Sequence, residues 1–93
     1  MARLPRIVIP GYPHHVTQRG NRRNRVFFDE GDYALYFDLL SEAALKSETE
    51  IRSYCLMPNH VHLIAVPSNK NGLRETFADA HRRYWAISMH ARE

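Results

Sequence analysis

The chain has 93 residues, 44% of them hydrophobic, with a formal net charge of +3 and a pI near 9.4. We take residues 1–93 as one small domain with a modest core. No apolar run reaches the length of a transmembrane helix, and no signal-peptide core is present, so a membrane partner is excluded. A single cysteine, Cys55, cannot form an internal disulfide, so we expect the reducing cytoplasm as the compartment. Because Cys55 lies in an apolar run, we also expect it to be buried.

The first predicted strand covers residues 14–19, where Val16 supplies a β-branched core side chain. Because side chains alternate along a strand, His15 and Arg19 then face the other side of the sheet. A polar, arginine-rich loop follows, and the planar fork of arginine suits phosphates and base edges. We expect the DNA-contacting residues to be Arg19, Asn21, Arg22, Arg23 and Arg25.

The distribution of charge supports this expectation. Residues 1–28 carry six arginines and no acidic residue, whereas residues 29–93 carry seven Lys or Arg against ten Asp or Glu. Such an asymmetry is typical of a phosphate-binding surface, although a solvated basic tail has the same composition.

The remaining elements follow in order. A helix is predicted over about residues 30–47, with Asp29 as its N-cap. Residues 51–57 and 60–66 predict two strands separated by only two residues, hence an antiparallel hairpin, and residues 73–91 predict a second amphipathic helix. The order β-α-β-β-α indicates an α+β, ferredoxin-like fold with an antiparallel sheet whose last strand is missing. That would leave one sheet edge bare, so we expect a chain that is incomplete at its C-terminal end.

Two histidines open the strand predicted over residues 60–66. His60 and His62 point to the same face, about 6–7 Å apart along the backbone. Two imidazoles on an open sheet face suit one divalent metal ion, although surface or hydrogen-bonded histidines fit the pattern too. A catalytic metal would need a third ligand, for which His14, His15 and Gln18 are the alternatives.

Tyrosine is the remaining reactive residue type. Tyr84 lies on the second predicted helix beside basic residues, which makes it the tempting nucleophile. However, Tyr84 also belongs to the apolar stripe of that helix, which predicts a core position.

Taken together, these residues resemble the single-tyrosine HUH transposases of insertion sequences, and among them the REP-associated tyrosine transposases. The resemblance rests on residues 13–22 (PHHVTQRGNR), 26–29 (VFFD) and 54–63 (YCLMPNHVHL). It implies that His60 and His62 are catalytic metal ligands for Mg²⁺ or Mn²⁺. It also implies cleavage and rejoining of single-stranded DNA that carries hairpins, through a 5′-phosphotyrosine link. Many members are dimers, which makes a homodimer an expected assembly.

The sequence departs from this family in one respect. The nucleophilic tyrosine of the family lies on a later helix, and no matching stretch occurs before Glu93. We therefore expect the N-terminal part of such a transposase, with the metal pair but without the nucleophile, and inactive alone. The alternatives are a non-catalytic single-stranded nucleic-acid-binding remnant or regulator, which would bind through its arginines without the histidines, and a structural dimerisation domain.

Overall fold

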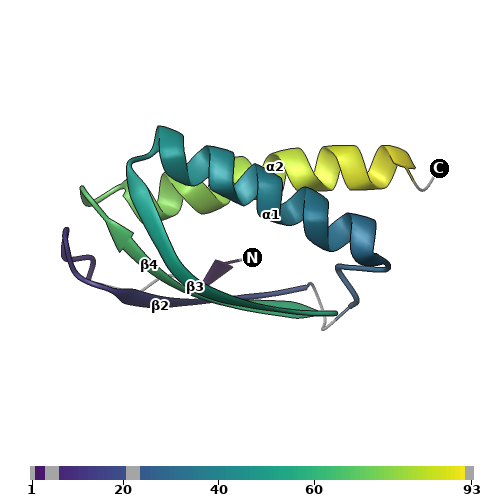
Figure 1. Cartoon of the computed structure of the whole chain (residues 1–93), viewed down its shortest axis with the longest axis horizontal. Helices are drawn as coiled ribbons and strands as arrows, with labels where there is room; N and C mark the ends of the chain where they lie inside the picture. Colours follow the sequence, from purple (N-terminus) through teal and green to yellow (C-terminus); the bar gives the residue numbers. More distant parts are fainter. Residues whose placement is uncertain (1, 4–6, 21–23, 92–93) are drawn as a thin grey trace.

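The computed structural model describes residues 2–3, 7–20 and 24–91, and the side chains of residues 7–20 and 24–88. Two helices lie side by side on one face of a sheet and leave the other face uncovered (Figure 1). The elements are strand β1 (Ala2–Arg3), strand β2 (His14–Arg19), helix α1 (Glu30–Lys46), strand β3 (Thr49–Met57), strand β4 (His60–Pro67) and helix α2 (Gly72–Ala91). The predicted α+β, ferredoxin-like order β-α-β-β-α is confirmed, with one short strand added at its start.

The strand order places β4 at the centre of the three long strands. The sheet runs β1-β2-β4-β3, and each neighbouring pair is antiparallel. Because β2 and β3 both oppose β4, they are parallel to each other, and α1 connects them across β4. This is the split β-α-β unit of ferredoxin-like folds. One edge of the sheet was expected to be bare, and the edge of β2 is partly covered, since Ala2 pairs with Gln18.

Local chemistry explains where α1 begins. The Asp29 carboxylate accepts a hydrogen bond of 2.9 Å from the backbone N–H of Asp32, as an N-cap should. In return, the Asp32 carboxylate accepts a 2.7 Å bond from the N–H of Phe28. These reciprocal bonds satisfy backbone donors that the helix itself cannot pair.

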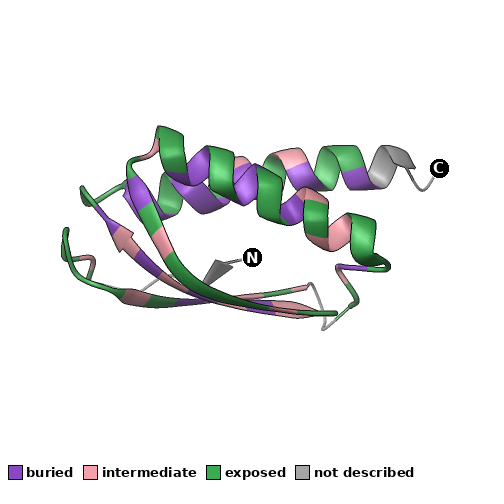
Figure 2. Cartoon of the chain, in the orientation of Figure 1, coloured by how far each residue is buried: buried purple, intermediate pink, exposed green. Residues whose placement is uncertain are grey.

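The core lies between the helices and the inner face of the sheet. Along β4, buried and half-buried residues alternate strictly (Figure 2). The buried residues Val61, Leu63 and Ala65 belong to the core beneath the helices. Aromatic side chains from the loop and both helices fill the layer, with Phe27 packed against Tyr36 and Tyr84. The histidines of β4 are thereby placed on the opposite, uncovered face.

One sequence prediction about burial is wrong. Cys55 is exposed rather than buried. Its apolar neighbours suggested a core strand, but β3 is an edge strand, and Cys55 lies opposite His62 in register on the uncovered face. The thiol therefore borders the histidine pair.

Candidate functional site

The candidate site is the uncovered face of the sheet around His60 and His62. Val61, between them, is 3% exposed and belongs to the core, so alternation directs both histidines away from the helices. In the register of β2 against β4, Thr17 lies opposite His62 and Arg19 opposite His60. The end of β2, which carries Arg19, and the histidine pair thus meet on one face, as the sequence pattern predicts.

The His60 ring is held by its preceding neighbour. Its Nδ1 lies 2.6 Å from Oδ1 of Asn59, within hydrogen-bond distance. An amide oxygen only accepts, and a proton on Nδ1 would leave the lone pair of the neutral ring on Nε2. The centroids of the His60 and His62 rings are 4.9 Å apart, with perpendicular planes.

The His62 ring is held from the neighbouring strand. Its Nδ1 lies 3.2 Å from Nε2 of His15 and 3.3 Å from Oγ1 of Thr17. Desolvation lowers the pKa of His62 below its usual 6.5, and the nearby positive charges of His60, His15 and Arg19 lower it further. His62 is therefore neutral at neutral pH, which is the form that binds metals.

The chemistry of these donors fits a divalent metal ion. Neither Nε2 atom of the pair has a hydrogen-bond partner within the described part of the chain. Neutral imidazole is a better ligand for first-row transition ions than for Mg²⁺, so such a pair would suit Mn²⁺ better than Mg²⁺. Across residues 7–20 and 24–88, no group of three or more His, Cys, Asp or Glu is arranged to hold a metal ion. The pair alone thus offers two ligands.

Two of the three alternatives for a third ligand are held elsewhere. His14 uses its Nε2 to accept a 3.1 Å hydrogen bond from the N–H of Ile9. Gln18 is bonded to Nδ1 of His81 at 2.8 Å, on the helix side of the sheet. Only His15 reaches the pair, and its Nε2 contacts the Nδ1 of His62.

Two of the five predicted DNA-contacting residues, Arg19 and Arg25, are among the described residues. Arg19 lies beside the pair in register. Arg25 donates a 2.7 Å hydrogen bond to the carbonyl oxygen of Phe27, and its guanidinium lies 5.4 Å from the centroid of the Phe28 ring, so it braces its own loop. The other three predicted residues, Asn21, Arg22 and Arg23, lie outside the described residues.

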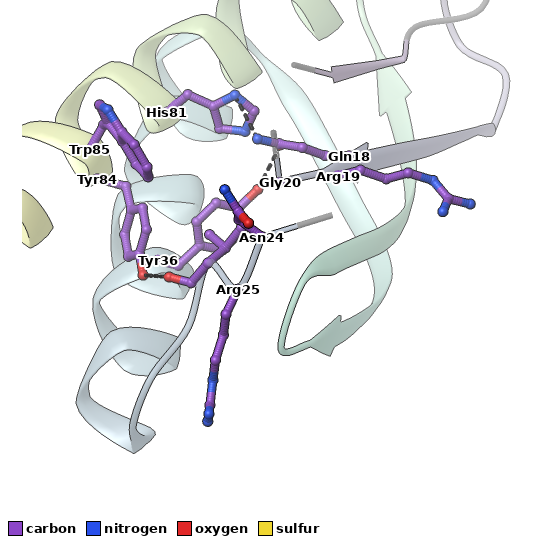
Figure 3. A pocket seen from close by; sticks show the side chains of 10 residues that line it. Gln18, Arg19, Gly20, Asn24, Arg25, Tyr36, His81, Tyr84 and Trp85 are labelled. Carbon is purple, nitrogen blue, oxygen red and sulfur yellow. Dashed lines mark hydrogen bonds between the residues drawn. The ribbon is translucent and has the colours of Figure 1, made fainter. Parts of the chain in front are cut away.

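A cavity of about 450 Å³ opens next to the arginine-rich loop, on the helix side of the sheet. Figure 3 shows Trp85 and Tyr36 at its walls, while Arg19 and Arg25 extend away from it. Trp85 is 58% exposed. Trp85 lies outside the apolar stripe of α2. A large aromatic residue outside such a stripe is the sequence signal that predicts an exposed ring at this cavity.

The tempting nucleophile, Tyr84, is a core residue. It is 2% exposed, and its hydroxyl donates a 2.7 Å hydrogen bond to the carbonyl oxygen of Val26. It lies on the helix side, whereas the histidine pair faces the other way. The core position predicted for Tyr84 is therefore confirmed.

Comparison with known families gives one match. The family described as transposase IS200-like matches residues 10–77, which include β2, α1, β3 and β4. No curated protein and no solved structure matches the chain. No helix within the described residues is long and apolar enough to cross a bilayer.

Proposed function

Since this chain belongs to the IS200-like transposase family, we propose that it is the metal- and DNA-binding part of an enzyme that cleaves and rejoins single-stranded DNA. One observation carries the proposal. His60 and His62 lie on an open sheet face, each with Nδ1 engaged by a neighbour and Nε2 without a partner in the described chain. Such an arrangement is how histidine ligands are commonly prepared for a metal.

The proposed reaction is a transesterification. A tyrosine oxygen forms a bond to the scissile phosphorus and loses its proton, the bond from phosphorus to the 3′ oxygen breaks, and that oxygen is protonated to a 3′-OH. Rejoining is the reverse attack by a 3′-OH on the phosphotyrosine. A Mg²⁺ or Mn²⁺ ion at the pair would stabilise the negative charge on the phosphate. Arg19, on the same face opposite His60, is suited to bind the DNA backbone.

The attacking tyrosine is, in this proposal, none of the buried ones. Tyr84 and Tyr36 both face the core, and burial raises the pKa of Tyr36 above its usual value, which opposes phenolate formation. Neither of these two buried tyrosines is therefore proposed as the nucleophile, and the chain alone is proposed to bind metal and DNA without cutting.

The proposed DNA partner is a single strand with hairpins, and the proposed site of contact is the arginine-rich segment. Arg22 and Arg23 are suited to phosphate contacts, each of which contributes about 0.7 to the salt slope of single-strand binding. We expect Arg22→Ala and Arg23→Ala each to weaken binding and to reduce that slope. Trp85 is the only tryptophan of the chain and lies near this loop, so its fluorescence can follow the titration.

The decisive experiment measures metal binding directly. Mn²⁺ bound by the full chain is counted by electron paramagnetic resonance, for the wild type, for His60→Ala with His62→Ala, and for the control His14→Ala. We expect binding by the wild type and the control and its loss in the double variant. If Mn²⁺ binding is absent, or is unaltered by loss of both histidines, the metal site does not exist.

A second measurement separates the enzyme from its rival. The rival is a non-catalytic binding module, which predicts DNA affinity without any contribution from metal. Hairpin-bearing single strands are titrated with and without Mn²⁺, against wild type and the double variant. The proposal predicts tighter binding with Mn²⁺ in the wild type only. Equal affinities in all four titrations would favour the rival.

The homodimer is proposed separately, and sedimentation velocity at rising protein concentration tests it. A sedimentation coefficient that rises with concentration would support a dimer.

A further inference from the structure

Three side chains surround the histidine pair without belonging to it, and their geometry points to a positioning role. We infer that His15, Thr17 and Asn59 hold His60 and His62 in the tautomer that carries its proton on Nδ1, so that both Nε2 lone pairs are available to a metal ion. The inference rests on the proposed metal-binding function. The three residues would position the imidazole rings without binding the metal ion themselves.

The contact between Asn59 and His60 is the simpler case. At 2.6 Å between Oδ1 and Nδ1, the contact is short for a hydrogen bond. With the proton on Nε2 instead, two lone pairs would face each other across this distance. The amide oxygen therefore selects the tautomer of His60 whose lone pair is on Nε2.

The rings of His15 and His62 are nearly parallel and lie within hydrogen-bond distance of each other. The ring planes differ by 6°, and the centroids are 5.2 Å apart while the nearest nitrogens are 3.2 Å apart. One proton can therefore be shared in a hydrogen bond between Nε2 of His15 and Nδ1 of His62.

The same distance excludes a metal ion between the two nitrogens. An ion midway would lie about 1.6 Å from each, whereas metal–imidazole bonds are about 2.0–2.1 Å long. His15 is therefore not the third ligand. Its Nε2 acts on the pair only through Nδ1 of His62.

Thr17 is a second partner of the same nitrogen. Its hydroxyl oxygen lies 3.3 Å from Nδ1 of His62 and can accept or donate a hydrogen bond. With Nδ1 protonated, His62 donates toward Thr17 and the Nε2 of His15. With Nδ1 unprotonated, either of these two groups can donate to it instead. The first arrangement is the one that leaves the lone pair of His62 on Nε2, as metal binding through that atom requires.

The test reads the tautomers in the metal-free protein and then the metal affinity. Nitrogen-15 NMR of the imidazoles distinguishes a protonated Nδ1 from a protonated Nε2. We expect Nδ1–H for both His60 and His62. Thr17→Val keeps the shape and removes the acceptor, and should lower Mn²⁺ affinity by about 10–100-fold, the usual effect of losing such a partner. Thr17→Ser keeps the acceptor and should restore the affinity to within about threefold of wild type.

Two further variants complete the test. The carboxylate of Asn59→Asp can only accept, so His60 should show the same Nδ1–H signal in this variant as in the wild type. A change of tautomer between the two proteins would mean that the wild-type amide donates to His60. His15→Phe should raise the population of Nε2–H at His62, while the control His14→Phe should not. If the metal-free wild type shows Nε2–H at either member of the pair, the inference is wrong even when Mn²⁺ binds. If the tautomers are as expected but Mn²⁺ does not bind, the proposed function fails instead.

Discussion

The hydroxyl of Tyr84, on α2, donates a 2.7 Å hydrogen bond to the carbonyl oxygen of Val26. This bond ties the second helix to the segment that leads from the arginine-rich loop into α1. The Tyr84 ring also packs against Phe27 and Tyr36, with centroid distances of 5.6 and 5.5 Å. The most reactive-looking tyrosine of the sequence is thus a structural link between the loop and the helix layer.

Substitution of Tyr84 tests this assignment. Tyr84→Phe keeps the ring packing and removes one buried hydrogen bond, so the free energy of unfolding should fall by about 0.5–1.5 kcal/mol in urea titrations. Tyr84→Ala should cost about 3–5 kcal/mol, because it also leaves a cavity. Mn²⁺ affinity of the Phe variant should equal that of the wild type. A covalent protein–DNA adduct that maps to Tyr84 would show that it is the nucleophile.

The stability of the chain should depend on the protonation of His81. Burial lowers its pKa from 6.5 to about 4 in the folded state. The unfolded chain takes up the proton first as pH falls, so this stability contribution is complete above pH 6.5 and is lost as pH falls toward 4. The loss approaches about 3 kcal/mol at the acid end. Urea titrations at several pH values give the unfolding free energy of the wild type and of His81→Gln as a function of pH. Between pH 6.5 and 4, this free energy should fall more steeply in the wild type than in the variant. Equal pH dependence in the two proteins would refute the prediction.

The N-cap of α1 gives a prediction with a matched control. Asp29→Ala removes the carboxylate that accepts from the N–H of Asp32, and should lower the free energy of unfolding by about 0.5–2 kcal/mol. Asp29→Asn keeps an accepting oxygen and should stay close to the wild type. If both variants lose the same stability, charge at the helix N-terminus, rather than the hydrogen bond, is what matters.

Gly20 should tolerate no side chain. A Cβ at this position would overlap the carbonyl oxygen of Asn24 and the side chain of Val26, so the loop would have to move. Gly20 also donates a 2.9 Å hydrogen bond to the carbonyl oxygen of Asn59, which links the arginine-rich loop to the hairpin turn before His60. Gly20→Ala is expected to lower the unfolding free energy by about 1–3 kcal/mol, as overpacking does, and to weaken binding of single-stranded DNA.

The control for Gly20 is Gly31. A Cβ there would meet Oδ1 of Asp29 at 3.1 Å, the oxygen that also accepts from the N–H of Asp32. Because alanine favours a helix over glycine by about 1 kcal/mol, which offsets a small shift of this carboxylate, Gly31→Ala should cost less stability than Gly20→Ala. A Gly20→Ala protein with wild-type stability and DNA affinity would contradict the proposed link between loop and turn.

The elements of the fold were predictable from local signals. Strand His14–Arg19 was predicted at its observed bounds, and α1 and α2 within one residue at each end. Strand β3 begins two residues before its predicted start, at Thr49. The two-residue hairpin was also predicted, because two residues between strands leave no other connection. The short β1 was not, since two residues carry no periodic pattern.

The sequence by itself determined that His60 and His62 share a face, because alternation along a strand is fixed by the backbone. Tertiary structure decided which groups surround them. His15 and Thr17 reach His62 from 47 and 45 positions away in the chain, through a strand register that no local pattern specifies. The exposure of Cys55 and the half-buried position of His81 were decided in the same way, by which strand lies at the edge and which helix face packs inward. The sequence places the two histidines on one face, and only the folded sheet brings His15 and Thr17 beside them.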